Sequence, residues 1–127
     1  MRLQGDRVGI AAANPATLLQ VLNATCNGTS WNDACSRELK QDITALETEE
    51  ARRAVMSLAP VKYSYKSDPG DARVGFIAED APELVATPDR RTLSSMDIVA
   101  ALTRVVQEQD RKIAELEARL NEMSREQ

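Results

Sequence analysis

The chemistry open to this chain is narrowed first by the side chains that it lacks. Its 127 residues include no histidine, which excludes Ser-His-Asp and Cys-His catalysis, histidine-ligated metals and histidine pH switches. A general base here must therefore be a lysine, a carboxylate or a terminal amine. Two cysteines, Cys26 and Cys35, are too few for the disulfide framework of a small secreted domain. They either pair with each other or remain two small, partly buried thiols.

Other chemical sites find little support in the sequence. Glu79 and Asp80 are adjacent carboxylates, but no further ligand cluster accompanies them, so we expect a surface role and no metal. No glycine-rich nucleotide loop occurs, and no cofactor is expected. The formal net charge of −4 argues against nucleic acid, which needs a basic surface. The apolar runs fall far short of the ~20 residues that span a bilayer, so no membrane insertion is expected.

The clearest element is a long helix that begins at Ser94 or Ser95, where Ser94 and Asp97 form a variant of the capping box. From Met96 to Met123 the apolar residues repeat in heptads, and seven of eight seam positions are apolar. With Val99 at position a, the seam comprises Val99, Val106, Ile113 and Leu120 at a, and Leu102, Gln109, Leu116 and Met123 at d. This pattern predicts a coiled coil.

Length favours self-association of this helix over packing against its own domain. Twenty-eight residues span ~42 Å, whereas a domain of ~100 residues has a radius of gyration of ~13 Å. The helix should therefore project from one chain and pair with other copies. The alternative is an amphipathic helix folded back onto its own body. Periodicity leaves dimer and trimer open, and Gln109 adds a polar layer that fixes register at a cost in stability.

The sequence ahead of the helix predicts an α+β arrangement in two parts. Residues 1–34 contain two short strands, at 7–10 and 18–22, and too few apolar residues for a core of their own. Residues 35–93 predict a compact body. A helix over 46–58 has Thr48 as its N-cap and ends at Pro60, and a hairpin covers 61–78 with its turn at 67–71.

Three ordered blocks carry a resemblance to a known family. The segment 31–43 is similar to the opening of the intramolecular chaperone auto-processing domain, which lies at the C-terminus of phage tailspikes, endosialidases, tail fibres and bacterial tail-fibre-like proteins. The family's second block is similar to segments 58–63 and 74–78 of this chain. Its third block is similar to segment 82–85 and the helix from residue 95 onward. Residues 1–34 look like the end of a fibre shaft. The resemblance covers about 90 residues, with the blocks in the right order.

This resemblance implies a homotrimeric coiled coil over 94–127, a chaperone body over 35–93, and self-cleavage between Ala34 and Cys35. In the family a serine attacks the preceding peptide bond, and a lysine five residues on is the base. Lys40 matches that lysine, but Cys35 stands in the place of the serine, and Ser36 follows it. A thiol at Cys35 activated by Lys40, an uncut domain, and attack by Ser36 all remain open.

The implied function is that of a C-terminal intramolecular chaperone. It would trimerise and align a tail-fibre or tailspike-like protein, with self-cleavage impaired by the Cys35 substitution. The alternatives are an active autoprotease that releases itself through Cys35 and Lys40, and a permanent trimeric fibre tip. Its partners would be its own copies and the upstream shaft of the same chain. The location would be a phage virion tail or the bacterial cell surface.

Overall fold

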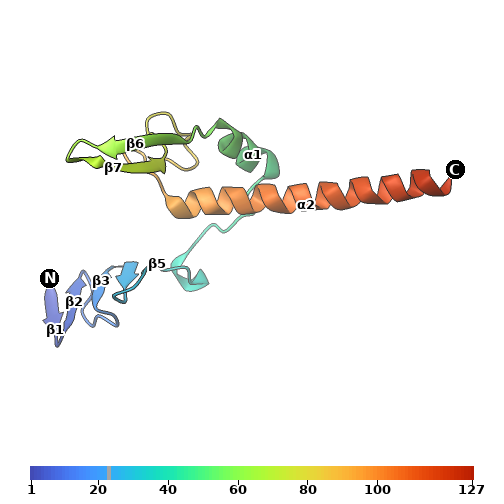
Figure 1. Cartoon of the computed structure of the whole chain (residues 1–127). Coiled ribbons are helices and arrows are strands. Elements are labelled where there is room, and N and C mark those ends of the chain that lie inside the picture. The colour runs from blue at the N-terminus through green and yellow to red at the C-terminus, as the bar shows by residue number, and fades with distance from the viewer. Residues whose placement is uncertain (23) are drawn as a thin grey trace. The chain divides into compact units, whose positions relative to one another are not determined.

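The computed structural model describes residues 1–22 and 24–127, which divide into two units, Met1–Thr44 and Ala45–Gln127. The first unit contains a five-stranded sheet in which neighbouring strands follow chain order (Figure 1). Its strands are β1 (Arg2–Gln4), β2 (Arg7–Ile10), β3 (Leu19–Val21), β4 (Ala24–Cys26) and β5 (Trp31–Asp33). Strands β2 and β3 are parallel, and the other neighbours are antiparallel. The predicted strands at 7–10 and 18–22 are therefore present, together with three that the sequence did not predict.

The parallel pairing of β2 and β3 requires a connection that doubles back, and the loop 11–18 provides it. Gly9 is essential to this arrangement, because a Cβ atom there would collide with the carbonyl oxygen of Ala12 and lie 3.4 Å from Pro15 Cγ. Pro15 is buried. The loop thus packs closely over Gly9, on the face of the sheet toward which a Gly9 side chain would point.

The second unit consists of α1 (Thr48–Ser57), the hairpin strands β6 (Val61–Tyr65) and β7 (Asp68–Gly75), and the long helix α2 (Ser95–Arg125). The molecule is therefore α+β, with an N-terminal sheet, a small hairpin and a long C-terminal helix (Figure 1). Ser94 caps α2, since its hydroxyl accepts a hydrogen bond from the Asp97 N–H at 3.2 Å. This confirms the cap that the sequence predicted. No helix within the described residues is long and apolar enough to cross a membrane.

Two boundaries in this unit differ from the sequence prediction. Helix α1 begins at Thr48, and the N-cap is Glu47, which makes no side-chain cap hydrogen bond. In the hairpin, Tyr65 pairs with Asp68, so the turn lies at residues 66–67 and not at 67–71. Pro69 and Gly70 lie in β7, where a register shift opposite the stretch from Tyr63 to Tyr65 accommodates a proline that cannot donate to the ladder. The strand ends at Gly75 and does not reach residue 78.

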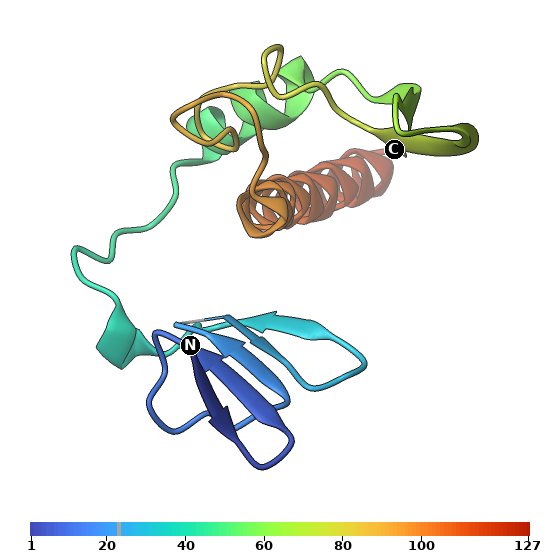
Figure 2. The same ribbon diagram turned by 90° about the vertical axis from the view of Figure 1, so that its left-hand side faces the viewer.

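The core of the second unit consists of small side chains between the two helices. Ala51 of α1 and Ala101 of α2 are fully buried, and Val105 is 7% exposed. Leu46, Val55 and Leu84 pack against this cluster. Figure 2 shows α1 alongside α2, as the contact requires. Alanines allow close approach but bury little apolar surface, so the core contributes modestly to stability.

The segment between the hairpin and α2 folds around the fully buried Val85. The Val85 carbonyl accepts a hydrogen bond from the Ser94 N–H at 3.0 Å, which positions the first turn of α2. The Arg90 guanidinium donates to the carbonyl oxygens of Glu79 and Ala81. This segment therefore connects the end of the hairpin to the start of the long helix in a defined conformation.

Candidate assembly interface and self-cleavage site

Helix α2 presents two apolar stripes, and only one of them is covered within the chain. Ala101 and Val105 pack against α1. The seven apolar seam residues remain 43–63% exposed: Val99, Leu102, Val106, Ile113, Leu116, Leu120 and Met123. In the heptad frame the covered stripe occupies positions c and g and the seam a and d, roughly 110° apart at 100° per residue. The helix thus packs on its own body without using its seam.

The distal part of α2 carries a charged network outside the seam. Arg111 forms ion pairs with Glu108 at 2.7 Å and with Glu115 at 3.5 Å, and Arg119 pairs with Glu115 at 2.6 Å. The hydrogen bond from Arg111 holds the pKa of the Glu108 carboxyl below its usual value, and the Arg111 and Lys112 charges act in the same direction. These charged residues make one side of the helix polar, and the apolar seam remains exposed.

The sheet of the first unit is apolar on one face and polar on the other. Leu3, Val8, Leu19, Cys26 and Trp31 are paired in succession across all five strands, and directly paired residues point to the same face. Residues two positions along a strand join that face, and they are Ile10, Val21, Ala24 and Asp33.

The paired row on the other face is Arg2, Gly9, Gln20, Thr25 and Asn32. The loop 11–18 packs over Gly9 on this polar face. On the apolar face, by contrast, Leu3 is 67% exposed and Trp31 is 63% exposed. The apolar face therefore exposes large side chains at both edge strands, whereas the loop 11–18 packs on the middle of the polar face.

The candidate cleavage residues lie just after β5. Cys35 and Lys40 flank a single-turn 3₁₀ helix, η1 (Arg37–Leu39), and both are exposed. The Ser36 hydroxyl caps this turn by accepting a hydrogen bond from the Glu38 N–H at 3.3 Å. Among the residues that the structure describes, no hydrogen bond or ion pair joins Cys35 to Lys40, and Lys40 forms no salt bridge with its acidic neighbours. One chain thus brings the two residues to either end of one turn without a direct contact.

The two cysteines are free thiols, with Cys26 half-buried in β4 and Cys35 exposed. Within residues 1–22 and 24–127, no three His, Cys, Asp or Glu side chains are grouped as a metal site requires.

Two features of these surfaces were missed by sequence reasoning. The apolar sheet face was hidden because β1, β4 and β5 are only three residues long, too short for an alternating pattern to be recognised. The contact of α2 with α1 was hidden because Ala101 is a weak hydrophobic signal beside the larger seam residues. Alternation in Arg2-Leu3-Gln4 and in Trp31-Asn32-Asp33 was the available signal for the sheet.

Comparison with known proteins gives a family match for the middle of the chain. The model of the family described as chaperone of endosialidase matches residues 35–88. This segment belongs to the endosialidase-chaperone family. No curated protein and no solved structure gives a significant match. The endosialidase-chaperone segment begins at Cys35, directly after β5, and ends before α2. This match supports a chaperone role for the segment.

Proposed function

We propose that this chain is the C-terminal assembly module of a tail-fibre or tailspike-like protein, and that three copies associate in parallel through α2. Residues 94–127 form the coiled coil, residues 35–93 the chaperone body, and residues 1–34 the end of the fibre shaft. The observation that carries this proposal is the exposed seam of α2, in which every apolar member is at least 43% exposed. Burying one such side chain fully stabilises an assembly by roughly 1.5–3 kcal/mol.

The charges beside the seam favour parallel helices in register. At the e positions stand Asp110 and Glu117, and at the g positions Lys112 and Arg119. In a parallel coil, g residues face e residues of the neighbour, so Lys112 meets Glu117. In an antiparallel coil, like positions would meet, and acidic residues would face acidic ones. Three copies, rather than two, are supported by the family resemblance.

The exposed surface of the chain also supports assembly. The chain exposes 10360 Å², whereas two compact globules with the sizes of its two units would expose roughly 8,000 Å² in total. The apolar face of the five-stranded sheet contributes to this excess. Three such sheets, facing one another around a common axis, would enclose a hydrophobic interior, as the end of a trimeric shaft requires.

Multi-angle light scattering at micromolar concentration tests the assembly. The expected mass is three times that of the 14.0 kDa chain. A stable monomer would contradict the proposal, and a dimer would keep the seam but overturn the trimer.

Self-cleavage between Ala34 and Cys35 is the second part of the proposal, and we infer that the cysteine impairs it. The family's nucleophile is a serine, and Cys35 stands in its place. Within residues 1–22 and 24–127 no hydrogen bond or ion pair joins Cys35 to Lys40, so activation of a nucleophile at position 35 by Lys40 would have to arise on assembly. Intact mass spectrometry of the incubated protein should show the full-length chain for the parent. Cys35→Ser should yield a fragment spanning residues 35–127, and Cys35→Ser combined with Lys40→Met should not.

Each other outcome of this experiment has a meaning. The same fragment from the parent would establish Cys35 as a working nucleophile and support the autoprotease alternative. Absence of the fragment from both the parent and Cys35→Ser would overturn the assignment of Cys35 and Lys40.

A further inference from the structure

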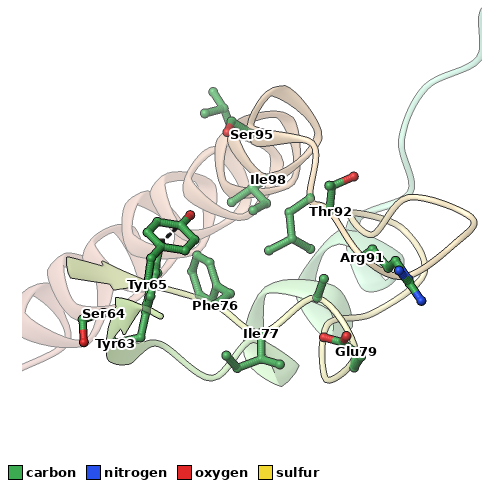
Figure 3. Close-up of a pocket in the computed structure, with 14 residues that line it drawn as sticks. Tyr63, Ser64, Tyr65, Phe76, Ile77, Glu79, Arg91, Thr92, Ser95 and Ile98 are labelled. Carbon is green, nitrogen blue, oxygen red and sulfur yellow. Dashed lines mark hydrogen bonds between the residues drawn. The ribbon is translucent and has the colours of Figure 1, made fainter. Parts of the chain in front are cut away.

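A groove of about 840 Å³ lies between the β6–β7 hairpin and the first turns of α2. Its apolar lining comes from both elements and from the segment that joins them, and it includes Tyr63, Tyr65, Phe76, Ile77, Ile98 and Val99. Figure 3 shows Phe76 and Ile98 directed into the same space, with the two tyrosines beside them. The tyrosine rings meet edge to face with their centroids 5.3 Å apart. This groove belongs entirely to the second unit.

The floor of the groove coincides with the first layer of the heptad seam. In a parallel coiled coil, each knob enters a hole formed by four residues of the facing helix. For a knob at the level of Val99, those four are Ser95 at d, Ile98 at g, Val99 at a and Leu102 at d. Ser95, Ile98 and Val99 all line the groove. The hole that should receive a neighbouring helix is therefore already walled on one side by the hairpin.

We propose that this groove receives the first two turns of α2 from a neighbouring copy of the chain, with Val99 and Met96 of that copy inserted beside Phe76. This inference rests on the proposed parallel assembly and extends its interface from the helix to the hairpin. The groove is continuous with the seam through Val99. The proposed occupant also has exposed apolar side chains of its own, because Met96 is 49% and Val99 54% exposed in the single chain.

Cross-linking between two differently labelled chains tests this contact. In a background of Cys26→Ala and Cys35→Ala, one chain carries Tyr65→Cys and a nitrogen-15-labelled chain carries Met96→Cys. After co-refolding and treatment with a short bismaleimide, the adduct should join one chain of each kind. Because each chain has one cysteine, no adduct can arise within a chain. A matched control pairs Tyr65→Cys with Ala118→Cys, which lies at an f position far along α2, and should give no adduct.

The outcomes separate this inference from the proposed function. A trimer by light scattering without the mixed adduct would overturn the groove contact and leave the assembly role standing. A monomer would overturn both.

Hydrogen exchange gives a second readout that needs no cysteine in the groove. The amides of residues 74–79 should exchange several-fold more slowly in the parent trimer than in the monomeric variant Leu116→Asp. Leu116 lies distant from the groove along the helix, so this variant leaves the groove residues themselves unchanged. Equal exchange in a trimeric parent and a monomeric variant would contradict the contact.

Discussion

The two apolar stripes of α2 show how one helix serves two kinds of packing. At Ala101 and Val105 the side chains are small, nearly fully buried and fitted against α1. At the seam they are larger, exposed and spaced in heptads from Val99 to Met123. Small residues fix the helix to its own body, whereas larger ones remain available to other copies. A helix that folded back through its seam would have no surface left for assembly.

The largest effect should follow from a charge in the exposed stripe. Leu116→Asp places three carboxylates in one seam layer, where burial of an unpaired charge is costly. We expect light scattering to show a monomer at micromolar concentration. The matched control is Ala118→Asp, two residues away at an f position outside the seam, which should remain trimeric. Dissociation of both variants would indicate a general effect of charge on the helix and not a seam.

A smaller effect should follow from disturbing the covered stripe. Ala101 is fully buried against α1, so Ala101→Leu overpacks the contact and should destabilise the fold by about 1–3 kcal/mol. Thermal unfolding should show a lower Tm for this variant, with the trimer mass unchanged below the transition. Loss of the trimer without a loss of Tm would mean that this stripe, too, faces other copies.

A third substitution tests the one polar position of the seam, Gln109, against its apolar neighbours. Gln109→Leu removes the polar layer, which costs stability but fixes register. We expect a higher Tm together with a less uniform population of oligomers in native mass spectrometry. A lower Tm would show that Gln109 forms favourable contacts across the assembly.

The smallest effect concerns the solvated side of α2. The hydrogen bond from Arg111 lowers the pKa of Glu108. The interaction of ionised Glu108 with Arg111 therefore stabilises the helix above the ordinary glutamate pKa, and this stabilisation is lost as pH falls through the lowered pKa. Glu108→Gln should therefore reduce helix stability slightly near neutral pH and have no effect in strong acid. Thermal melts followed by circular dichroism at both pH values measure this difference, and an equal effect at both would contradict it.

The sequence predicted those elements whose pattern is long enough to average over local exceptions. Helix α2 and its cap at Ser94 follow from four heptads and a capping signal, and the structure has both. The predicted hairpin turn is misplaced because Pro69 and Gly70 are typical turn residues, whereas in the structure they lie in β7, in the register shift between the Tyr65–Asp68 and Tyr63–Arg73 pairs. The sequence predicts Thr48 as the N-cap because its hydroxyl suits that position, yet the N-cap is Glu47, one residue earlier.

The candidate site also has parts that the sequence predicts and parts that it does not. That the heptad residues share one side of α2 could be predicted from spacing alone, because a helix projects every third or fourth residue to one side; their role in assembly stays a prediction. The groove beside Phe76 could not be predicted in this way, since it depends on how a hairpin and a helix some 20 residues apart in the chain are placed in space. The roles of Cys35 and Lys40 are implied by the resemblance, and in the part of the chain that the structure describes no hydrogen bond or ion pair joins the two residues.

The position of Ala34 directly after β5 has a consequence for the reversibility of unfolding. Hydrolysis after Ala34 would leave all five strands in the N-terminal product and remove all of α2, the helix that we propose directs assembly. Under the proposed function, the N-terminal product, once melted, would have no means of restoring its register, and its heating and cooling curves would diverge. An intact chain keeps α2 and should retrace the same curve.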